Sequence, residues 1–215
     1  MNLCLLSLVT GSIVLIVAIL AFLAGVVIGR QFHHRRNVGE ALVANAIAAG
    51  FKRQHVLLNN VTLQNAAASV QIDHLLVADT GIFVIETKHY TGWIFGNPSD
   101  RHWTQVIYRF RSKFRNPIHQ NYGHMKAVQS LFTLPMEAYF SVVVFTGEAE
   151  LKSDFGPEVL RLHELIPYLT TNRPAIFDER KIAYVVGRIE MQRMRRSVET
   201  DEYHLNSVRR RIDRG

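Results

Sequence analysis

The sequence predicts an α/β fold, an α+β arrangement in which helices flank a mixed sheet. Val70–Lys88 carries two apolar, β-branched runs joined by a turn at 78–81, which is the pattern of a β-hairpin. Tyr139–Phe145 is almost wholly apolar, as is typical of a strand that is buried on both faces of a sheet. Val38–Ala49 and Gln120–Leu134 carry small or apolar residues at helical spacing, so one helix precedes the hairpin and another follows it.

The composition limits the partners of the chain. Its 215 residues leave room for one ordinary domain and an additional segment. Lys and Arg number 25 against 18 Asp and Glu, a net charge of +7, and every charged side chain lies after Gly29. This excess suits an anionic partner, nucleic acid or lipid headgroups, although basic residues beside a membrane can also serve only to set topology. The single cysteine, Cys4, excludes an internal disulfide and a zinc site of several cysteines.

A long apolar run predicts a membrane anchor. Leu3–Gly29 contains no charged residue and exceeds the roughly 20 residues that a transmembrane helix needs. A signal peptide is the alternative, but it would begin with basic residues and have a shorter apolar core. Three arginines in the flank 30–36 place the C-terminal domain on the cytoplasmic side of the inner membrane, as a single-pass protein. Gly25 and Gly29 have the spacing of a helix-pairing motif, a candidate homodimer face.

The elements around the hairpin follow from local patterns. Asn37 is a candidate cap for the helix Val38–Ala49. A first strand is expected within Phe51–Leu63, interrupted at Asn59 and Asn60, and Trp103 opens a further strand.

An alternating run follows Trp103. Tyr108–Arg115 places its aromatic residues on one face of an expected strand and its basic residues on the other. Such a basic ridge can follow the phosphates of a nucleic acid, and a solvated edge strand that is protected by charge has the same pattern. The ridge consists of Arg109, Arg111, Lys113 and Arg115.

The C-terminal part of the chain reads as helices and a polar tail. Asn116 and Pro117 end the alternating strand, because proline cannot donate to a ladder. A short helix is expected at Val159–Leu169, and Asp178 is a candidate cap for another helix that reaches about residue 195. The extension 151–196 therefore reads as helical, and 197–215 as a basic, polar tail.

The hairpin carries three charged residues that call for an explanation. Glu86 and Lys88 share one face of the second strand, since side chains alternate along a strand. Asp73 lies in the first strand, where pairing can bring it beside Glu86. Charges inside apolar runs are costly unless they are paired or bind a metal ion. Two carboxylates and a lysine on one face indicate a site for a divalent cation and a water molecule.

The ordered set of residues around this site resembles the NERD (nuclease-related) domain and, through Asp…Glu-x-Lys, the PD-(D/E)xK nuclease superfamily. The resemblance covers residues 37–150 and implies a restriction-endonuclease-like core with flanking helices. The residues that carry it are Gly39-Glu40, Gln71–His74, Gly81–Lys88, Trp103, and Asn116-Pro117 followed by Gln120.

The resemblance also implies roles for single residues. Asp73 and Glu86 are expected to hold Mg²⁺ or Mn²⁺, with the backbone carbonyl of Thr87 as a third ligand, and Lys88 to act in catalysis. Glu40 either reaches this site, as a first-helix carboxylate often does in the superfamily, or complements its helix dipole. Gln120 either orients a water molecule or phosphate oxygen, or bonds the start of its helix.

Two functions remain open at this point. One is metal-dependent hydrolysis of phosphodiester bonds in nucleic acid, DNA in the first instance, by a membrane-anchored nuclease. The other is a catalytically inactive module that binds nucleic acid or a partner at the inner membrane face. The sequence lacks the glycine-rich phosphate and dinucleotide loops and the serine-hydrolase elbow. His119 and His124 are not spaced four residues apart, and they are not assigned a role.

Overall fold

The computed structural model describes residues 17–22, 38–64 and 69–194. The chain divides into two units, Met1–Val38 and Gly39–Gly215. In the first unit the described segment is helical, with exposed side chains.

Most of the expected membrane anchor lies outside the described residues. Of Leu3–Gly29 only the segment 17–22 is described, and the flank 30–36, the pair Gly25 and Gly29, and the tail 197–215 are not. Within the described ranges no helix is both long enough and apolar enough to cross a bilayer.

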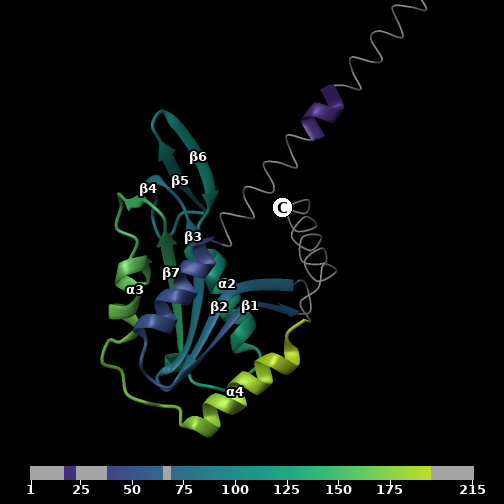
Figure 1. Cartoon of the computed structure of the whole chain (residues 1–215), viewed down its shortest axis with the longest axis vertical. Helices are drawn as coiled ribbons and strands as arrows, with labels where there is room; N and C mark the ends of the chain where they lie inside the picture. Colours follow the sequence, from purple (N-terminus) through teal and green to yellow (C-terminus); the bar gives the residue numbers. More distant parts are fainter. Residues whose placement is uncertain (1–16, 23–37, 65–68, 195–215) are drawn as a thin grey trace, which may run out of the picture. The chain divides into compact units, whose positions relative to one another are not determined.

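Two mixed sheets and several helices make up the second unit, which confirms the predicted mixed α+β class (Figure 1). A helix over 38–50 comes first. The later elements are β1 (His55–Gln64), β2 (Ser69–Ala78), β3 (Gly81–His89), β4 (Gly92–Phe95), β5 (His102–Ile107), β6 (Phe110–Arg115), α2 (Pro117–Gln129), the 3₁₀ turn η1 (Met136–Ala138), β7 (Tyr139–Thr146), β8 (Ala149–Leu151), β9 (Val159–Arg161), α3 (Leu162–Leu169) and α4 (Glu179–Gln192).

The larger sheet has the strand order β1-β2-β3-β7-β9. The first three strands are antiparallel neighbours, whereas β7 runs parallel to β3 and β9 parallel to β7. The expected hairpin is thus β2–β3, and the apolar run beginning at Tyr139 is β7. Strand β3 lies in the middle, and its residues 81–87 are buried.

Helices cover both faces of this sheet. Val84 of β3 shares a buried cluster with Val128 of α2 and Ile182 of α4. Phe83, the neighbouring residue, shares another with Ile47 of the helix 38–50 and with α3. Because side chains alternate, Glu86 and Lys88 continue the α2 side, and Thr87 and His89 continue the other side.

The smaller sheet has the order β6-β5-β4-β8 and stands at the C-terminal ends of β3 and β7. Trp103 of β5 is fully buried and stacks on Phe145 of β7, with ring centroids 6.3 Å apart. Figure 1 shows the β5–β6 hairpin extending beyond β3 and β7. This aromatic contact fixes the smaller sheet to the end of the larger one.

Four elements differ from the expected ones. Strand β1 runs through Asn59 and Asn60 without the expected interruption. The alternating run from Tyr108 is not one strand, because Tyr108 adopts φ +54° and the chain reverses there before β6. Helix α2 begins at Pro117, three residues early, because Asn116 caps it and proline suits the first helical position. The expected helix at Val159–Leu169 begins with the short strand β9.

Candidate active site

The site forms where β2 and β3 separate. Their ladder ends at the pair His74–Ile85, so Asp73 and Glu86 come next on the two strands. Beyond this point β3 stays paired with β7, and β2 stays paired with β1. The backbone N–H of Thr87 donates to Oδ2 of Asp73 at 2.9 Å. The carboxylate of Asp73 therefore ties the two strands together past the end of their ladder, and it is buried there.

The buried carboxylate of Glu86 forms an ion pair with the half-buried amine of Lys88. The Nζ of Lys88 lies 2.5 Å from Oε1 of Glu86, and the two side chains are 16% and 3% exposed. Burial raises the pKa of Glu86, but the charge of Lys88 and the contact with His124 outweigh it and lower that pKa to about 2. Burial lowers the pKa of Lys88, and the charge and hydrogen bond of Glu86 reverse this, so that the pKa lies above its ordinary value. Both groups are therefore charged at neutral pH.

Helix α2 supplies two further side chains. The Nζ of Lys88 donates to Oε1 of Gln120 at 3.1 Å. The Nδ1 of His124 lies 3.3 Å from Oε2 of Glu86. Sequence reasoning gave His124 no role because it was compared with His119. His124 follows Gln120 by four residues, and residues four apart share one helix face, so this spacing indicates that both side chains point to the same site.

Asn116 fixes the start of α2. Its Oδ1 accepts from the N–H of Ile118 at 2.9 Å, which caps the helix. Its Nδ2 donates to the carbonyls of Pro98 and Asp100 at 2.9 and 2.7 Å. The Asn-Pro pair in the sequence thus joins the helix that carries Gln120 to the loop before β5.

Asn121 fixes α2 on the sheet. It is fully buried, and its Nδ2 donates to the carbonyl of Val84 at 2.8 Å and to that of Val142 at 3.1 Å. These bonds join the helix to β3 and β7 just below Glu86. They set the height at which Gln120 and its neighbours meet the ion pair.

Glu40 lies on a helix of the other layer. Its neighbour Gly39 packs so closely that an added Cβ would lie 2.8 Å from Cβ of His89 and 2.8 Å from Oγ1 of Thr146. Those residues belong to the face of β3 and β7 that is turned away from α2. Glu40 is buried, 6% exposed. Its proposed part in catalysis stays a prediction.

Asp73 and Glu86 are the two buried carboxylates at this site that would hold a magnesium or manganese ion. Among the described residues no group of three or more His, Cys, Asp or Glu side chains is placed to hold a metal ion. Mg²⁺, however, commonly takes one or two carboxylates and completes its shell with water and phosphate oxygens. Oε2 of Glu86 is buried, and no hydrogen bond from the described residues reaches it. Together with Asp73 it offers a two-carboxylate site.

Most of the predicted basic ridge lies on β6, the strand that precedes α2. Arg111, Lys113 and Arg115 are exposed on β6, and alternation places them on one face. Arg109 lies in the turn before β6 and is exposed as well. Because β6 is followed directly by Asn116 and α2, the ridge ends beside the helix that carries Gln120.

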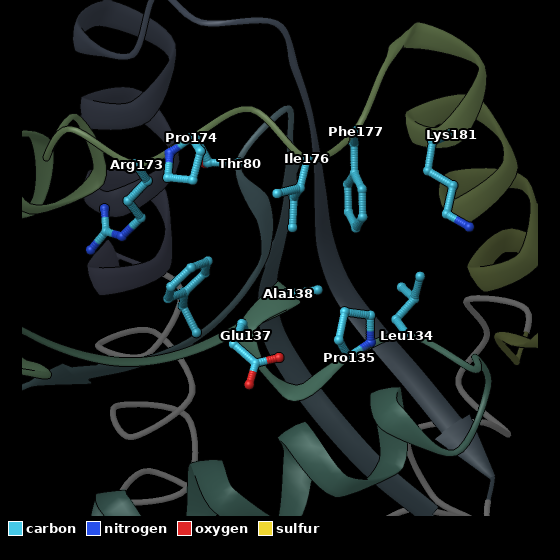
Figure 2. A pocket seen from close by; sticks show the side chains of 11 residues that line it. Thr80, Leu134, Pro135, Glu137, Ala138, Arg173, Pro174, Ile176, Phe177 and Lys181 are labelled. Carbon is cyan, nitrogen blue, oxygen red and sulfur yellow. The ribbon is translucent and has the colours of Figure 1, made fainter.

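A separate apolar pocket of about 420 Å³ lies near the β2–β3 turn, at the opposite end of β3 from Lys88. Figure 2 shows Ile176 and Phe177 facing Leu134 and Pro135 across it. Its lining is mostly apolar, and Glu86 and Lys88 do not line it. The charged site and this pocket are therefore distinct.

Comparison with known proteins identifies the family. A relative from Bacillus anthracis, named only as an uncharacterized protein, is 37% identical over 139 residues, which cover 64% of this chain and 65% of that protein. No solved structure matches the chain significantly. The model of the nuclease-related domain matches residues 35–146, and this span includes the site and all of β1 to β7. The chain belongs to the nuclease-related domain (NERD) family.

Proposed function

We propose that this chain is a metal-dependent nuclease that hydrolyses phosphodiester bonds in nucleic acid, DNA in the first instance, through a restriction-endonuclease-like core. One observation carries the proposal: the buried acid Glu86 and the half-buried amine Lys88 meet beside Asp73, where β2 and β3 separate. Membership in a nuclease-related family supports it.

Asp73 and Glu86 would hold Mg²⁺ or Mn²⁺, with the carbonyl of Thr87 as a further ligand. Such an ion lowers the pKa of a water molecule and neutralises phosphate charge. The protein then has to hold the two acids in place and keep water molecules ordered. The backbone N–H of Thr87 holds one of these acids, Asp73, by a hydrogen bond.

Lys88 would stabilise the negative charge that develops on the phosphate in the transition state. Its raised pKa keeps the amine protonated at neutral pH, and Gln120 fixes the direction of its Nζ. A fixed positive charge in a buried site stabilises a transition state far more than a mobile one in water. Gln120 is thus assigned as a positioning residue.

Cleavage of DNA by the full chain tests this assignment. With Mg²⁺ or Mn²⁺ present, Lys88→Ala should lower the cleavage rate by about 10²-fold or more, as the loss of one oxyanion donor does. Lys52→Ala, at an exposed position, is the matched control and should cleave normally. Melting curves show whether each variant folds. Gln120→Ala removes the hydrogen bond that positions the amine of Lys88 and leaves the ion pair between Lys88 and Glu86 in place. Normal cleavage in a folded Lys88→Ala protein removes the assignment.

The geometry also supports the second function, a catalytically inactive binding module. Oε1 of Glu86 is already engaged by Lys88, and the described residues hold no cluster of three acids or histidines suited to a metal ion. A module of this kind would bind nucleic acid without metal and would not cleave it under any metal condition. Binding and cleavage measured on one preparation distinguish the two.

Membrane attachment through Leu3–Gly29 is the final part of the proposal. It is supported by the uncharged apolar run and by the arginines in 30–36. The full chain should remain in the membrane pellet after alkaline extraction. Crosslinking of Gly25→Leu and Gly29→Leu variants tests the proposed homodimer face. Release of the chain into the alkaline supernatant contradicts the anchor.

A further inference from the structure

The outer face of the smaller sheet places aromatic and basic side chains in the same rows. Trp93 of β4 lies opposite Val106 of β5, and Val106 lies opposite Arg111 of β6. Residues directly opposite in antiparallel strands point to one face, so all three side chains point the same way. The next row, two residues along, contains Phe95 and Lys113 in the corresponding positions.

This face is exposed, although it carries large aromatic rings. Trp93 and Phe95 are 49% and 38% exposed, whereas Trp103 on the inner face of the same sheet is 0% exposed. The Nζ of Lys152 lies 5.1 Å from the centroid of the Trp93 ring and 2.6 Å from Oε2 of Glu150, which lies opposite Trp93 on β8. Exposed rings flanked by cations do not stabilise a core, so they indicate a binding surface.

The hairpin tip repeats the combination of rings and charges. Tyr108 is 96% exposed and adopts φ +54°, a backbone conformation that is strained for a residue with a bulky side chain. Glycine or asparagine would occupy this turn without that strain. Phe110 is 68% exposed, with the guanidinium of Arg109 5.6 Å from its ring centroid. Strain at a position without packing contacts is typical of a functional residue.

We propose that this surface binds single-stranded nucleic acid. We call it the aromatic–basic face, and its residues are Trp93, Phe95, Arg111, Lys113 and Arg115, with Tyr108 at the tip. Positive side chains in a row follow a phosphate backbone, and exposed rings offer faces on which unpaired bases stack. In a duplex those base faces are covered by neighbouring bases. The aromatic rings therefore favour single-stranded over double-stranded nucleic acid, whereas the basic side chains alone would bind both.

The strands that carry the face are joined directly in the chain to the elements of the proposed catalytic site. Strand β4 begins four residues after Lys88, and β6 passes through Asn116 into the helix that carries Gln120. The inference rests on the proposed function for its substrate, but binding itself requires neither a metal ion nor cleavage.

Tryptophan fluorescence measures this binding directly. The chain has two tryptophans, and of these Trp103 is fully buried, so quenching by a bound base reports on Trp93. The full chain is titrated with an unlabelled oligo(dT) in EDTA, which prevents cleavage, and then with a duplex of equal length. The single strand should quench the emission and bind more tightly than the duplex.

Variants locate the contact. Trp93→Ala should raise the Kd for a labelled oligo(dT), read by anisotropy, by about tenfold. Trp93→Phe should retain most of the affinity, and Tyr184→Ala, an exposed ring on α4, should retain all of it. The double variant Arg111→Ala/Lys113→Ala should reduce the salt dependence of binding by about 1.4 in slope, at ~0.7 per contact. Arg180→Ala/Arg188→Ala, at exposed positions of α4, is its control.

The outcomes separate this inference from the proposed function. Equal affinity for duplex and single strand, or an unchanged Kd in a folded Trp93→Ala protein, overturns the inference and leaves cleavage untouched. Quenching by anionic lipid vesicles, with none by oligo(dT), assigns the face to a membrane surface and also overturns it. Tight binding of oligo(dT) by a chain that never cleaves supports the inference and removes only the nuclease.

Discussion

The amine of Lys88 lies 2.5 Å from the carboxylate of Glu86, two residues away on the same strand. Apolar side chains of the core and the buried polar side chains of Asp73, Asn121 and His124 surround this pair. Removing two charges from water costs several kcal/mol, and a good pair only approximately offsets this. Relative to apolar side chains of similar volume, the intact pair therefore contributes little net stability, whereas neutralising one partner alone is strongly destabilising.

The pH dependence of stability reports on this pair. The folded pKa of Glu86 is about 2, below its ordinary value of 4.5, so its contribution is complete above pH 4.5 and is lost as the pH falls toward 2. At 1.36 kcal/mol per pKa unit, this amounts to about 3 kcal/mol. Urea unfolding between pH 7 and pH 2 should therefore show a steeper loss in the wild type than in Glu86→Gln.

Glu150→Gln is the matched control for that experiment. Lys152 also lowers the pKa of Glu150, but this carboxylate is exposed, and exposed pairs contribute little. Its unfolding curve should follow the wild type at every pH. If Glu86→Gln follows the wild type as well, the ionised pair does not exist in the folded protein.

Asn121 should be essential for the position of α2. Asn121→Leu removes the donor that reaches the carbonyls of Val84 and Val142, and leaves both acceptors buried. Its free energy of unfolding should fall by about 1–3 kcal/mol for the loss of a buried hydrogen-bonding group. Gln129→Ala removes an exposed hydrogen bond to the sulfur of Met136 and should remain within about 0.5 kcal/mol of the wild type.

Gly39 should tolerate no side chain. Gly39→Ala places a methyl group 2.8 Å from atoms of His89 and Thr146, and separating the helix from the strands should cost about 1–3 kcal/mol. Gly187→Ala in α4, where an added Cβ meets no atom within 4 Å, should stabilise the protein by about 0.5–1 kcal/mol. Thermal melting of the two variants gives opposite signs if the packing is as described. Equal melting temperatures would falsify the close approach of the first helix to β3.

Regular patterns in the sequence were sufficient for much of the fold. The β2–β3 hairpin and β7 follow from long apolar runs, and the cap at Asp178 follows from its residue type and position. The hydrogen bond between Lys88 and Gln120 could be anticipated, because both residues belong to the sequence pattern of the nuclease-related domain.

Other features depend on contacts that no local pattern contains. Tyr108 reverses the chain without a glycine or asparagine, so the β5–β6 turn gives no signal in the sequence. Strands β8 and β9 have three residues each, too few for a periodicity to appear. His124 meets Glu86 only because Asn121 seats α2 on the sheet, and this placement is a tertiary effect.

The central claim is that Asp73 and Glu86 hold one divalent ion beside Lys88. Isothermal titration of the full chain with Mn²⁺ tests it most directly, with Asp73→Asn/Glu86→Gln as the test variant and Glu179→Gln/Glu190→Gln on α4 as the matched control. The account predicts saturable heat for a single ion in the wild type and the control, and none in the test variant. Equal heat in all three proteins, or no heat in the wild type, contradicts it.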